Sequence, residues 1–198
     1  MTPDLLFALI LFAFASSITP GPNNIMLLAS GANFGIARTV PHMLGISLGH
    51  ALMVALIGLG LLQMFVALPS LRPALMAACA AYLLYLAWKI ANAAPPGEAT
   101  TTARPFTFVQ AAAFQWVNPK AWYMAIYAQT HFAPEGAGWA GALAVPVVFA
   151  LVNLPSVAVW AAAGTQLRRW LRSPARLRAF NITMALVLVA SLYPMLTG

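Results

Sequence analysis

Long apolar segments separated by short polar connections make up most of this chain. Each segment has close to the 20 or so apolar residues that a helix needs to cross a bilayer. The predicted segments are residues 5–30, 41–65, 73–91, 108–127, 139–167 and 180–196. The pattern predicts an all-α, polytopic membrane protein with six transmembrane helices in a single domain over residues 1–198.

The first and fourth predicted helices each contain a polar, proline-containing motif near the middle. Each of them opens a group of three helices, so the second group must be inverted relative to the first. We therefore predict a three-helix repeat over residues 3–92, a cytoplasmic linker over 93–107 and an inverted repeat over 108–198. Inverted repeats with broken helices at matching positions are typical of secondary transporters.

The boundary of the second helix is marked by two residues. Thr39 is expected to cap this helix, and Pro41 suits its first turn.

Composition supports lipid as the solvent for this surface. Hydrophobic residues make up 62% of the chain and charged residues 7%, against about 25% charged residues in soluble domains. The net charge of +7 could suggest a nucleic-acid partner, but half of the basic residues lie between Arg168 and Arg178, beside an apolar segment. That placement favours contact with anionic lipid headgroups and argues against nucleic acid.

The basic residues also predict an orientation, because Lys and Arg gather in cytoplasmic connections. One side of the predicted bundle has Arg38, Lys89, Arg104, Arg168, Arg169, Arg172, Arg176 and Arg178. The opposite side has only Arg72. We therefore expect the first side to be cytoplasmic and both termini to be periplasmic.

The motif of the first helix, Thr19–Asn24, contains two prolines that remove backbone donors and a glycine that loosens the chain. Broken backbone at membrane depth is tolerated where it faces protein or a wet cavity. The helix that resumes at Pro22 would offer free N–H groups to a carboxylate, and Asn23 and Asn24 add amides. The alternative is a structural kink whose asparagines bond neighbouring helices.

The motif of the fourth helix, Asn118–Lys120, places a lysine deep in a span. Such a residue is a functional candidate by default. Lys120 could bind a substrate carboxylate or change protonation; alternatively, it reaches an interface or bonds the carbonyls that Pro119 frees. Gln115, Trp116 and Trp122 flank this break as further cavity candidates.

Two other helices contribute candidates. Gly45 and Gly49 form a small-residue face that predicts close helix packing. His50 follows directly and is the titratable candidate for proton coupling together with Lys120, because Asp4, Glu98 and Glu135 fall near span ends or in loops; a structural histidine is the alternative.

The remaining predictions concern the fifth helix and the whole site. Asn153–Pro155 is expected to break that helix, lining the same cavity or only kinking it. The full set of candidate substrate-binding residues is Thr19, Pro20, Gly21, Pro22, Asn23, Asn24, Asn118, Pro119, Lys120 and Asn153. No nucleotide loop, metal-ligand cluster, nucleophile elbow or paired carboxylate set is present, so we predict no enzyme, no metal and no cofactor.

The motifs Ile18–Asn24, Gly45–Gly49 and Asn118–Lys120 resemble those of the LysE/RhtB family of bacterial amino-acid exporters, over the whole chain. Residues 82–91, YLLYLAWKIA, look most like its cysteine/O-acetylserine branch. The resemblance implies efflux across the bacterial inner membrane, driven by the proton gradient, and a homodimer. Many members have an acidic residue where this chain has His50, which puts carboxylate-based coupling in doubt.

The function expected from the broken helices, together with what the resemblance implies, is proton-coupled export, by alternating access, of small neutral or polar amino acids, or their derivatives. No span interior offers a carboxylate that would suit a lysine-type side chain. The alternatives are an intramembrane redox protein or enzyme, for which the single cysteine, Cys79, is unfavourable, and a non-transporting membrane scaffold.

Overall fold

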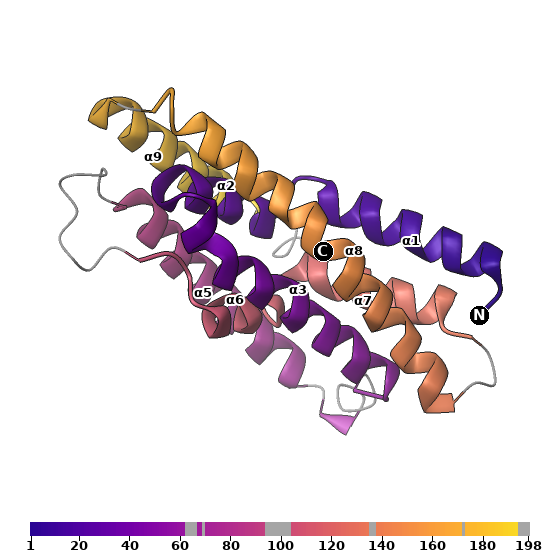
Figure 1. Cartoon of the computed structure of the whole chain (residues 1–198). Coiled ribbons are helices and arrows are strands. Elements are labelled where there is room, and N and C mark those ends of the chain that lie inside the picture. Colours follow the sequence, from indigo (N-terminus) through magenta and orange to yellow (C-terminus); the bar gives the residue numbers. More distant parts are fainter. Residues whose placement is uncertain (62–66, 69, 94–103, 135–137, 172, 194–198) are drawn as a thin grey trace.

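A computed structural model describes residues 1–61, 67–68, 70–93, 104–134, 138–171 and 173–193 (Figure 1). Over these residues every regular element is a helix, which confirms the predicted all-α class. The helices are α1 (Pro3–Ile18), α2 (Pro22–Phe34), α3 (Ile36–Gly58), α5 (Leu71–Ala91), α6 (Phe108–Gln115), α7 (Pro119–Phe132), α8 (Gly138–Leu167) and α9 (Pro174–Ala190). Most of the predicted linker, together with Glu98 and Glu135, falls outside the described residues.

The first predicted span is a broken helix, as its motif indicated. α1 ends at Ile18, α2 begins at Pro22, and the two helices are bent by 57° relative to each other. Pro22 occupies the first turn of α2, where its missing N–H removes no helical hydrogen bond. The break therefore consists of the three residues between Ile18 and Pro22.

The fourth predicted span is broken as well. α6 begins with a capping box between Thr107 and Gln110 and ends at Gln115. α7 begins at Pro119, and the Asn118 side chain caps it by accepting a hydrogen bond from the Lys120 main-chain N–H at 3.2 Å. Both broken spans thus resume at a proline in the first helical turn.

α3 begins earlier than predicted. Gly35, with φ of 80°, joins α2 directly to α3, which starts at Ile36. The roles predicted for Thr39 and Pro41 at the helix start were wrong, since both lie inside α3. The Thr39 hydroxyl donates instead to the Gly35 carbonyl oxygen at 2.8 Å, within its own helix.

The prediction of a break in the fifth span was wrong. α8 runs without a break from Gly138 to Leu167, so Asn153–Pro155 does not interrupt the fifth span. Pro155 has no N–H to donate to the Leu151 carbonyl oxygen. Both residues are exposed. The proline therefore perturbs only the outer face of α8, where the helix can accommodate it by bending.

α9 begins at Pro174, six residues before the predicted start at Phe180. Arg176 and Arg178 lie in its first two turns, not in a loop. Arginine is a good helix former, so these basic residues extend the helix beyond the apolar segment.

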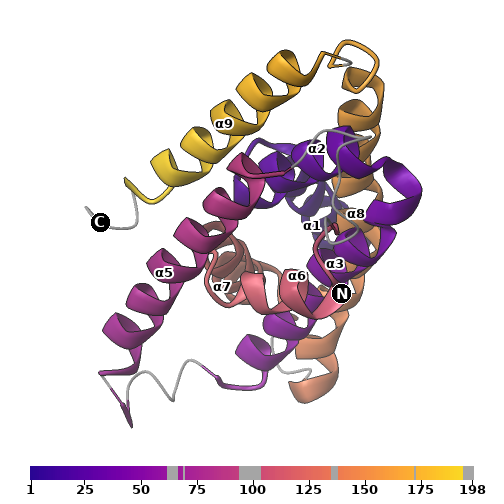
Figure 2. The same cartoon turned by 90° about the vertical axis from the view of Figure 1, so that its left-hand side faces the viewer.

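The helices pack around α3 and α8. α8 contacts α1, α2 and α3, while α3 contacts α6 and α7 as well as α2. α5 and α9 pack against each other, and α9 also contacts α2. Figure 2 shows the α5–α9 pair at one flank of the other helices.

Two helix pairs approach so closely that only glycine fits at the contact. On α2, a Cβ at Gly31 would overlap the carbonyl oxygen of Ala161 of α8. On α8, a Cβ at Gly164 would overlap the Leu28 carbonyl oxygen of α2. The main chains of α2 and α8 are therefore in direct contact.

The second close pair is α3 with α6. A Cβ at Gly45 would overlap the Phe108 carbonyl oxygen, and one at Gly49 would lie 2.6 Å from Cα of Ala112. The packing face predicted for these two glycines is confirmed.

The described residues include three helical segments that are long and apolar enough to cross a membrane: 36–58, 73–91 and 143–167. The bent pair α1–α2 makes a fourth if it is counted as one span. Large apolar side chains cover the outside: Phe7 is 64% exposed and Leu151 is 71% exposed. An apolar exterior of this kind belongs in lipid.

Candidate functional site

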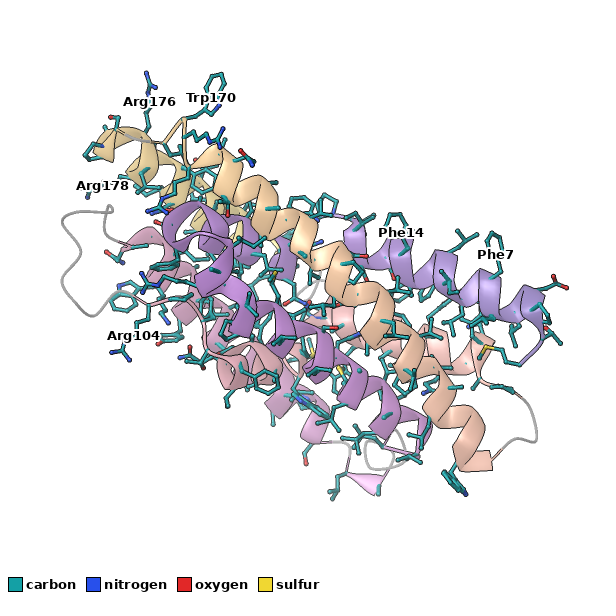
Figure 3. The ribbon with its side chains drawn as sticks, viewed as in Figure 1. Phe7, Phe14, Arg104, Trp170, Arg176 and Arg178 are labelled. Atoms are coloured by element: carbon teal, nitrogen blue, oxygen red, sulfur yellow. The ribbon has the colours of Figure 1, made fainter. Side chains whose placement is uncertain are left out.

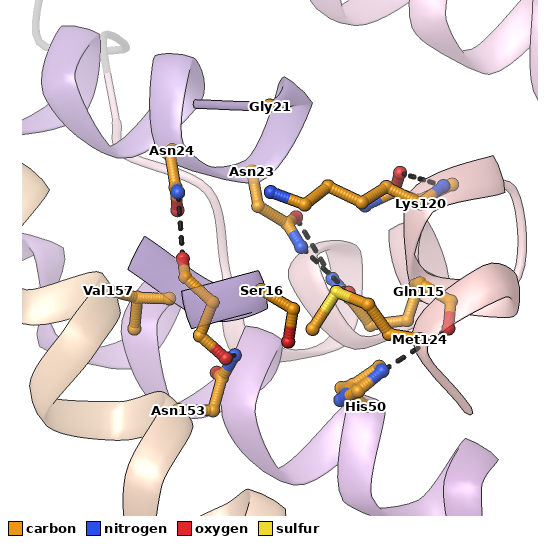
Figure 4. A pocket seen from close by; sticks show the side chains of 13 residues that line it. Ser16, Gly21, Asn23, Asn24, His50, Gln115, Lys120, Met124, Asn153 and Val157 are labelled. Carbon is orange, nitrogen blue, oxygen red and sulfur yellow. Dashed lines mark hydrogen bonds between the residues drawn. The ribbon is translucent and has the colours of Figure 1, made fainter. Parts of the chain in front are cut away.

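A polar pocket lies where the two breaks meet, inside the bundle (Figure 4). Its empty volume is about 330 Å³, which includes space open to solvent. Side chains or backbone from α1, α2, α3, α6, α7 and α8 line it. The lining residues are Ser16, Ser17, Gly21, Asn23, Asn24, His50, Gln115, Asn118, Lys120, Ala121, Met124, Asn153 and Val157.

The unwound backbone of the first break is held by side chains from elsewhere. Asn24 Nδ2 donates to the carbonyl oxygens of Ser17 at 2.9 Å and Thr19 at 2.7 Å. Trp160 Nε1 of α8 donates to the Ile18 carbonyl oxygen at 3.0 Å. Carbonyl groups that α1 can no longer bond within itself are therefore paired, as an apolar surrounding requires.

Lys120 connects the two breaks. Its Nζ donates to the Thr19 carbonyl oxygen at 2.7 Å, to Thr19 Oγ1 at 2.9 Å and to the Pro20 carbonyl oxygen at 3.4 Å. Its stem passes over Gly21, where a Cβ would lie 3.0 Å from Lys120 Cδ. Glycine at this position leaves room for the lysine.

A pair of amides forms a second connection. Asn23 Nδ2 donates to Gln115 Oε1 at 2.8 Å, and Gln115 Nε2 donates back to Asn23 Oδ1 at 3.1 Å. Gln115 Nε2 also donates to the Ala111 carbonyl oxygen at 2.9 Å within α6. The start of α2 and the end of α6 are thus joined reciprocally.

α2 starts at the pocket, where Gly21, Asn23 and Asn24 line it. Pro22 has no N–H, and those of Asn23 and Asn24 have no partner within the helix, because they belong to its first turn. The positive end of the helix dipole and these donors favour an anionic group nearby.

His50 and Asn153 complete the pocket from α3 and α8. His50 Nε2 lies 3.3 Å from the Ala121 carbonyl oxygen, and the ring packs edge-on against Phe149 with centroids 5.0 Å apart. Asn153 Nδ2 donates to Ser17 Oγ at 3.0 Å. His50 Nδ1 and Asn153 Oδ1 are buried and have no hydrogen-bond partner among the described residues.

The structure brings most of the predicted site together. Six of the ten predicted substrate-binding residues line the pocket: Gly21, Asn23, Asn24, Asn118, Lys120 and Asn153. The four that do not line it are Thr19, Pro20, Pro22 and Pro119, which shape the breaks. His50 and Gln115 also line it, whereas Trp116 and Trp122 do not; Trp122 Nε1 donates to the Trp116 carbonyl oxygen at 2.9 Å.

Sequence reasoning missed some lining residues. Ser16 and Ser17 directly precede the first break, and their position at the end of an apolar helix was a usable signal. Met124 and Val157 read as ordinary apolar helix residues and gave no signal. Together with Ala121, they provide the apolar part of the lining.

Two broken helices that face each other across a polar pocket, within an apolar helical bundle, define the class of helical membrane transporters. A family model described as "LysE type translocator" matches residues 14–191. The chain belongs to this family, as its motifs predicted, and is a transporter, not an enzyme.

Curated relatives of this chain have names that agree with the family. The proteins named "Cysteine/O-acetylserine efflux protein" from Escherichia coli (strain K12) and Shigella sonnei (strain Ss046) are each 33% identical over 190 residues, which is 96% of this chain and 96% of theirs. These names confirm the resemblance to that branch. No solved structure matches this chain.

Proposed function

We propose that this protein exports small neutral or polar amino acids of the cysteine and O-acetylserine type from the cytoplasm across the bacterial inner membrane. The observation that supports it is the polar pocket built from both helix breaks. The substrate carboxylate binds near the start of α2, where the N–H groups of Asn23 and Asn24 lie. The names of the relatives support this substrate class.

The lining of the pocket supports a substrate whose side chain has no charge. Lys120 is the one charged side chain among the lining residues, and no carboxylate is present there. A cationic side chain would therefore have no counter-ion. Met124 and Val157 suit a short side chain such as a thiol or an ester.

The contacts between helices support six spans arranged as two inverted repeats, 3–92 and 108–198. The broken helix of the first repeat packs on α8, and that of the second packs on α3. A pseudo-two-fold axis that exchanges the two repeats also exchanges these two contacts, because α3 and α8 hold matching places in the repeats.

The distribution of charge supports cytoplasmic exposure of the end where α9 begins. Figure 3 shows Arg104, Arg176 and Arg178 at that end, and Phe7 toward the opposite end. Both termini are periplasmic in this orientation. Access to the pocket alternates between the two sides, and proton movement through His50 or Lys120 drives the cycle.

The experiment that tests this function is efflux from cells and proteoliposomes. Cells that overproduce the protein are challenged with toxic levels of amino acids and analogues, cysteine and O-acetylserine included, and excretion is measured. Purified protein in liposomes with an imposed pH gradient should move the same compound. Unaltered efflux by Lys120→Ala and by the double variant Pro20→Ala, Pro22→Ala would remove the proposed site, with Asn92→Ala as the control outside the pocket.

Protein that binds and moves none of these compounds in liposomes would support the scaffold alternative instead.

A further inference from the structure

Two buried polar atoms of the pocket have an unused hydrogen-bonding capacity. Asn153 is 4% exposed and His50 is 2% exposed. Asn153 Oδ1 and His50 Nδ1 have no partner among the described residues, although the other polar atom of each side chain has one. A buried polar group without a partner costs about 1 to 3 kcal/mol, so an atom of this kind in a binding pocket points to a ligand group.

Both atoms are acceptors. Asn153 donates its amide N–H to Ser17 Oγ, which leaves the amide oxygen without a partner. The Ala121 carbonyl oxygen can only accept, so Nε2 of the neutral His50 ring holds the proton, and Nδ1 has the lone pair. Two unfilled acceptors in one pocket that has no carboxylate match a donor group.

A third acceptor lines the same pocket. Ser16 Oγ donates to the Phe12 carbonyl oxygen at 2.6 Å, and its lone pairs remain available. In the view of Figure 4, Ser16 lies between Asn153 and His50. A primary ammonium group has three N–H donors, the number that these acceptors can receive.

We propose that Asn153 Oδ1, His50 Nδ1 and Ser16 Oγ bind the α-ammonium group of the exported amino acid. This inference rests on the proposed function and adds the orientation of the substrate. The carboxylate lies at the start of α2 and the ammonium group at α3 and α8. The site is selective for primary amines and excludes N-acylated amino acids.

In this assignment, substrate binding is coupled to protonation at a single atom, His50 Nδ1. A proton on His50 Nδ1 converts the acceptor into a donor and adds a positive charge, so proton and ammonium group exclude each other. Lys120 of α7 is the charged lining residue that faces the same pocket. α2, α6 and α8 contribute no titratable residue, α1 contributes Asp4 at its first turn, α3 contributes Arg38 and His42, and α7 also contributes Tyr123, Tyr127 and His131.

Two variants of His50 test the roles of the two ring nitrogens separately. His50→Asn keeps an acceptor where Nδ1 lies and removes the contact with Ala121. His50→Gln places an amide N–H near the former Nε2 and leaves no acceptor at the Nδ1 position, because its amide oxygen lies at the far end of the side chain. The readout is uptake of labelled cysteine by proteoliposomes, competed by cysteamine, which lacks the carboxylate, and by 3-mercaptopropionate, which lacks the ammonium group.

For His50→Gln we expect apparent cysteine affinity to fall about tenfold to hundredfold, the loss typical of a hydrogen bond to a charged group. Competition by cysteamine should fall with it, while competition by 3-mercaptopropionate should stay the same. His50→Asn should recover most of the affinity. Asn153→Leu, which keeps the branched shape of the side chain and removes the acceptor, should behave like His50→Gln.

Matched controls lie on the same helices outside the pocket. His42 is a buried histidine two turns before His50, and Ser156 is a buried serine whose hydroxyl bonds its own helix at Val152. His42→Gln and Ser156→Ala should keep the cysteine affinity.

The inference is overturned if His50→Gln or Asn153→Leu weakens competition by both compounds equally. It is also overturned if competition by 3-mercaptopropionate falls more than competition by cysteamine. Wild-type protein that takes up no cysteine would instead overturn the proposed function.

Discussion

Nζ of Lys120 lies 2.7 Å from the carbonyl oxygen of Thr19, a residue 101 positions earlier in the chain. The contact joins the start of α7 to the unwound segment between α1 and α2. One side chain therefore bonds the two helix breaks to each other and also lines the pocket between them.

Replacing this lysine tests the connection. Lys120→Met should lower stability by about 1 to 2 kcal/mol, because it removes charge-assisted hydrogen bonds that are partly exposed, and it should abolish efflux. Thermal unfolding in detergent and efflux measure the two effects. Lys89→Met is the matched control, since Nζ of Lys89 lies over the Phe106 ring at 4.5 Å, outside the central pocket. Wild-type stability in Lys120→Met would contradict the connecting role.

Asn24 is expected to be needed for folding more than for binding. Asn24→Ala removes the donor to the Ser17 and Thr19 carbonyl oxygens in a side chain that is 3% exposed. The loss of these buried bonds should destabilise the protein by about 1 to 3 kcal/mol. Thermal unfolding should show no comparable change for Asn92→Ala, an exposed asparagine that bonds Trp88 of its own helix. Equal stability of the two variants would show that the break needs no donor from Asn24.

Gly31→Ala should disrupt packing between α2 and α8, because the added methyl group would meet main-chain atoms that cannot move aside. Overpacking of this kind costs about 1 to 3 kcal/mol. Gly58→Ala should be milder, since the atoms nearest to its methyl group would belong to the Gln129 side chain, which can move. Fluorescence-detected size-exclusion chromatography after heating would rank the thermal stability of the two variants. The reverse ranking would contradict the close contact between α2 and α8.

The proposed orientation can be measured with single cysteines in a Cys79→Ser background. Ala175→Cys lies in the first turn of α9, in the basic region, and Thr2→Cys precedes α1; both positions are exposed. A membrane-impermeant maleimide added to intact cells, with the outer membrane permeabilised, should label Thr2→Cys only. Labelling of Ala175→Cys before lysis would reverse the proposed topology.

The sequence predicted the breaks because their cause is local. Two prolines around Gly21, and one proline after Asn118, remove helical hydrogen bonds wherever the helix packs. Pro155 has the same local effect, yet α8 continues through it, because Pro155 faces outward. That distinction depends on tertiary position, which a single sequence does not reveal.

Contacts across the site were beyond sequence reasoning for a similar reason. Lys120 was expected to bond carbonyls freed by Pro119 or a substrate, and it bonds Thr19 and Pro20 of the other break. Trp160 of α8 donates to the Ile18 carbonyl oxygen, a contact that nothing in the local sequence indicates. Polarity and depth indicated which residues matter, while their partners depend on how distant helices pack.

The glycine contacts determine which parts of the molecule can move. Main-chain contact at Gly31 and Gly164 fastens α2 to α8, and contact at Gly45 and Gly49 fastens α3 to α6, so neither pair can slide without steric overlap. Each pair joins a helix of the N-terminal half of the chain to one of the C-terminal half. A hinge between the two halves of the sequence would therefore have to separate both pairs.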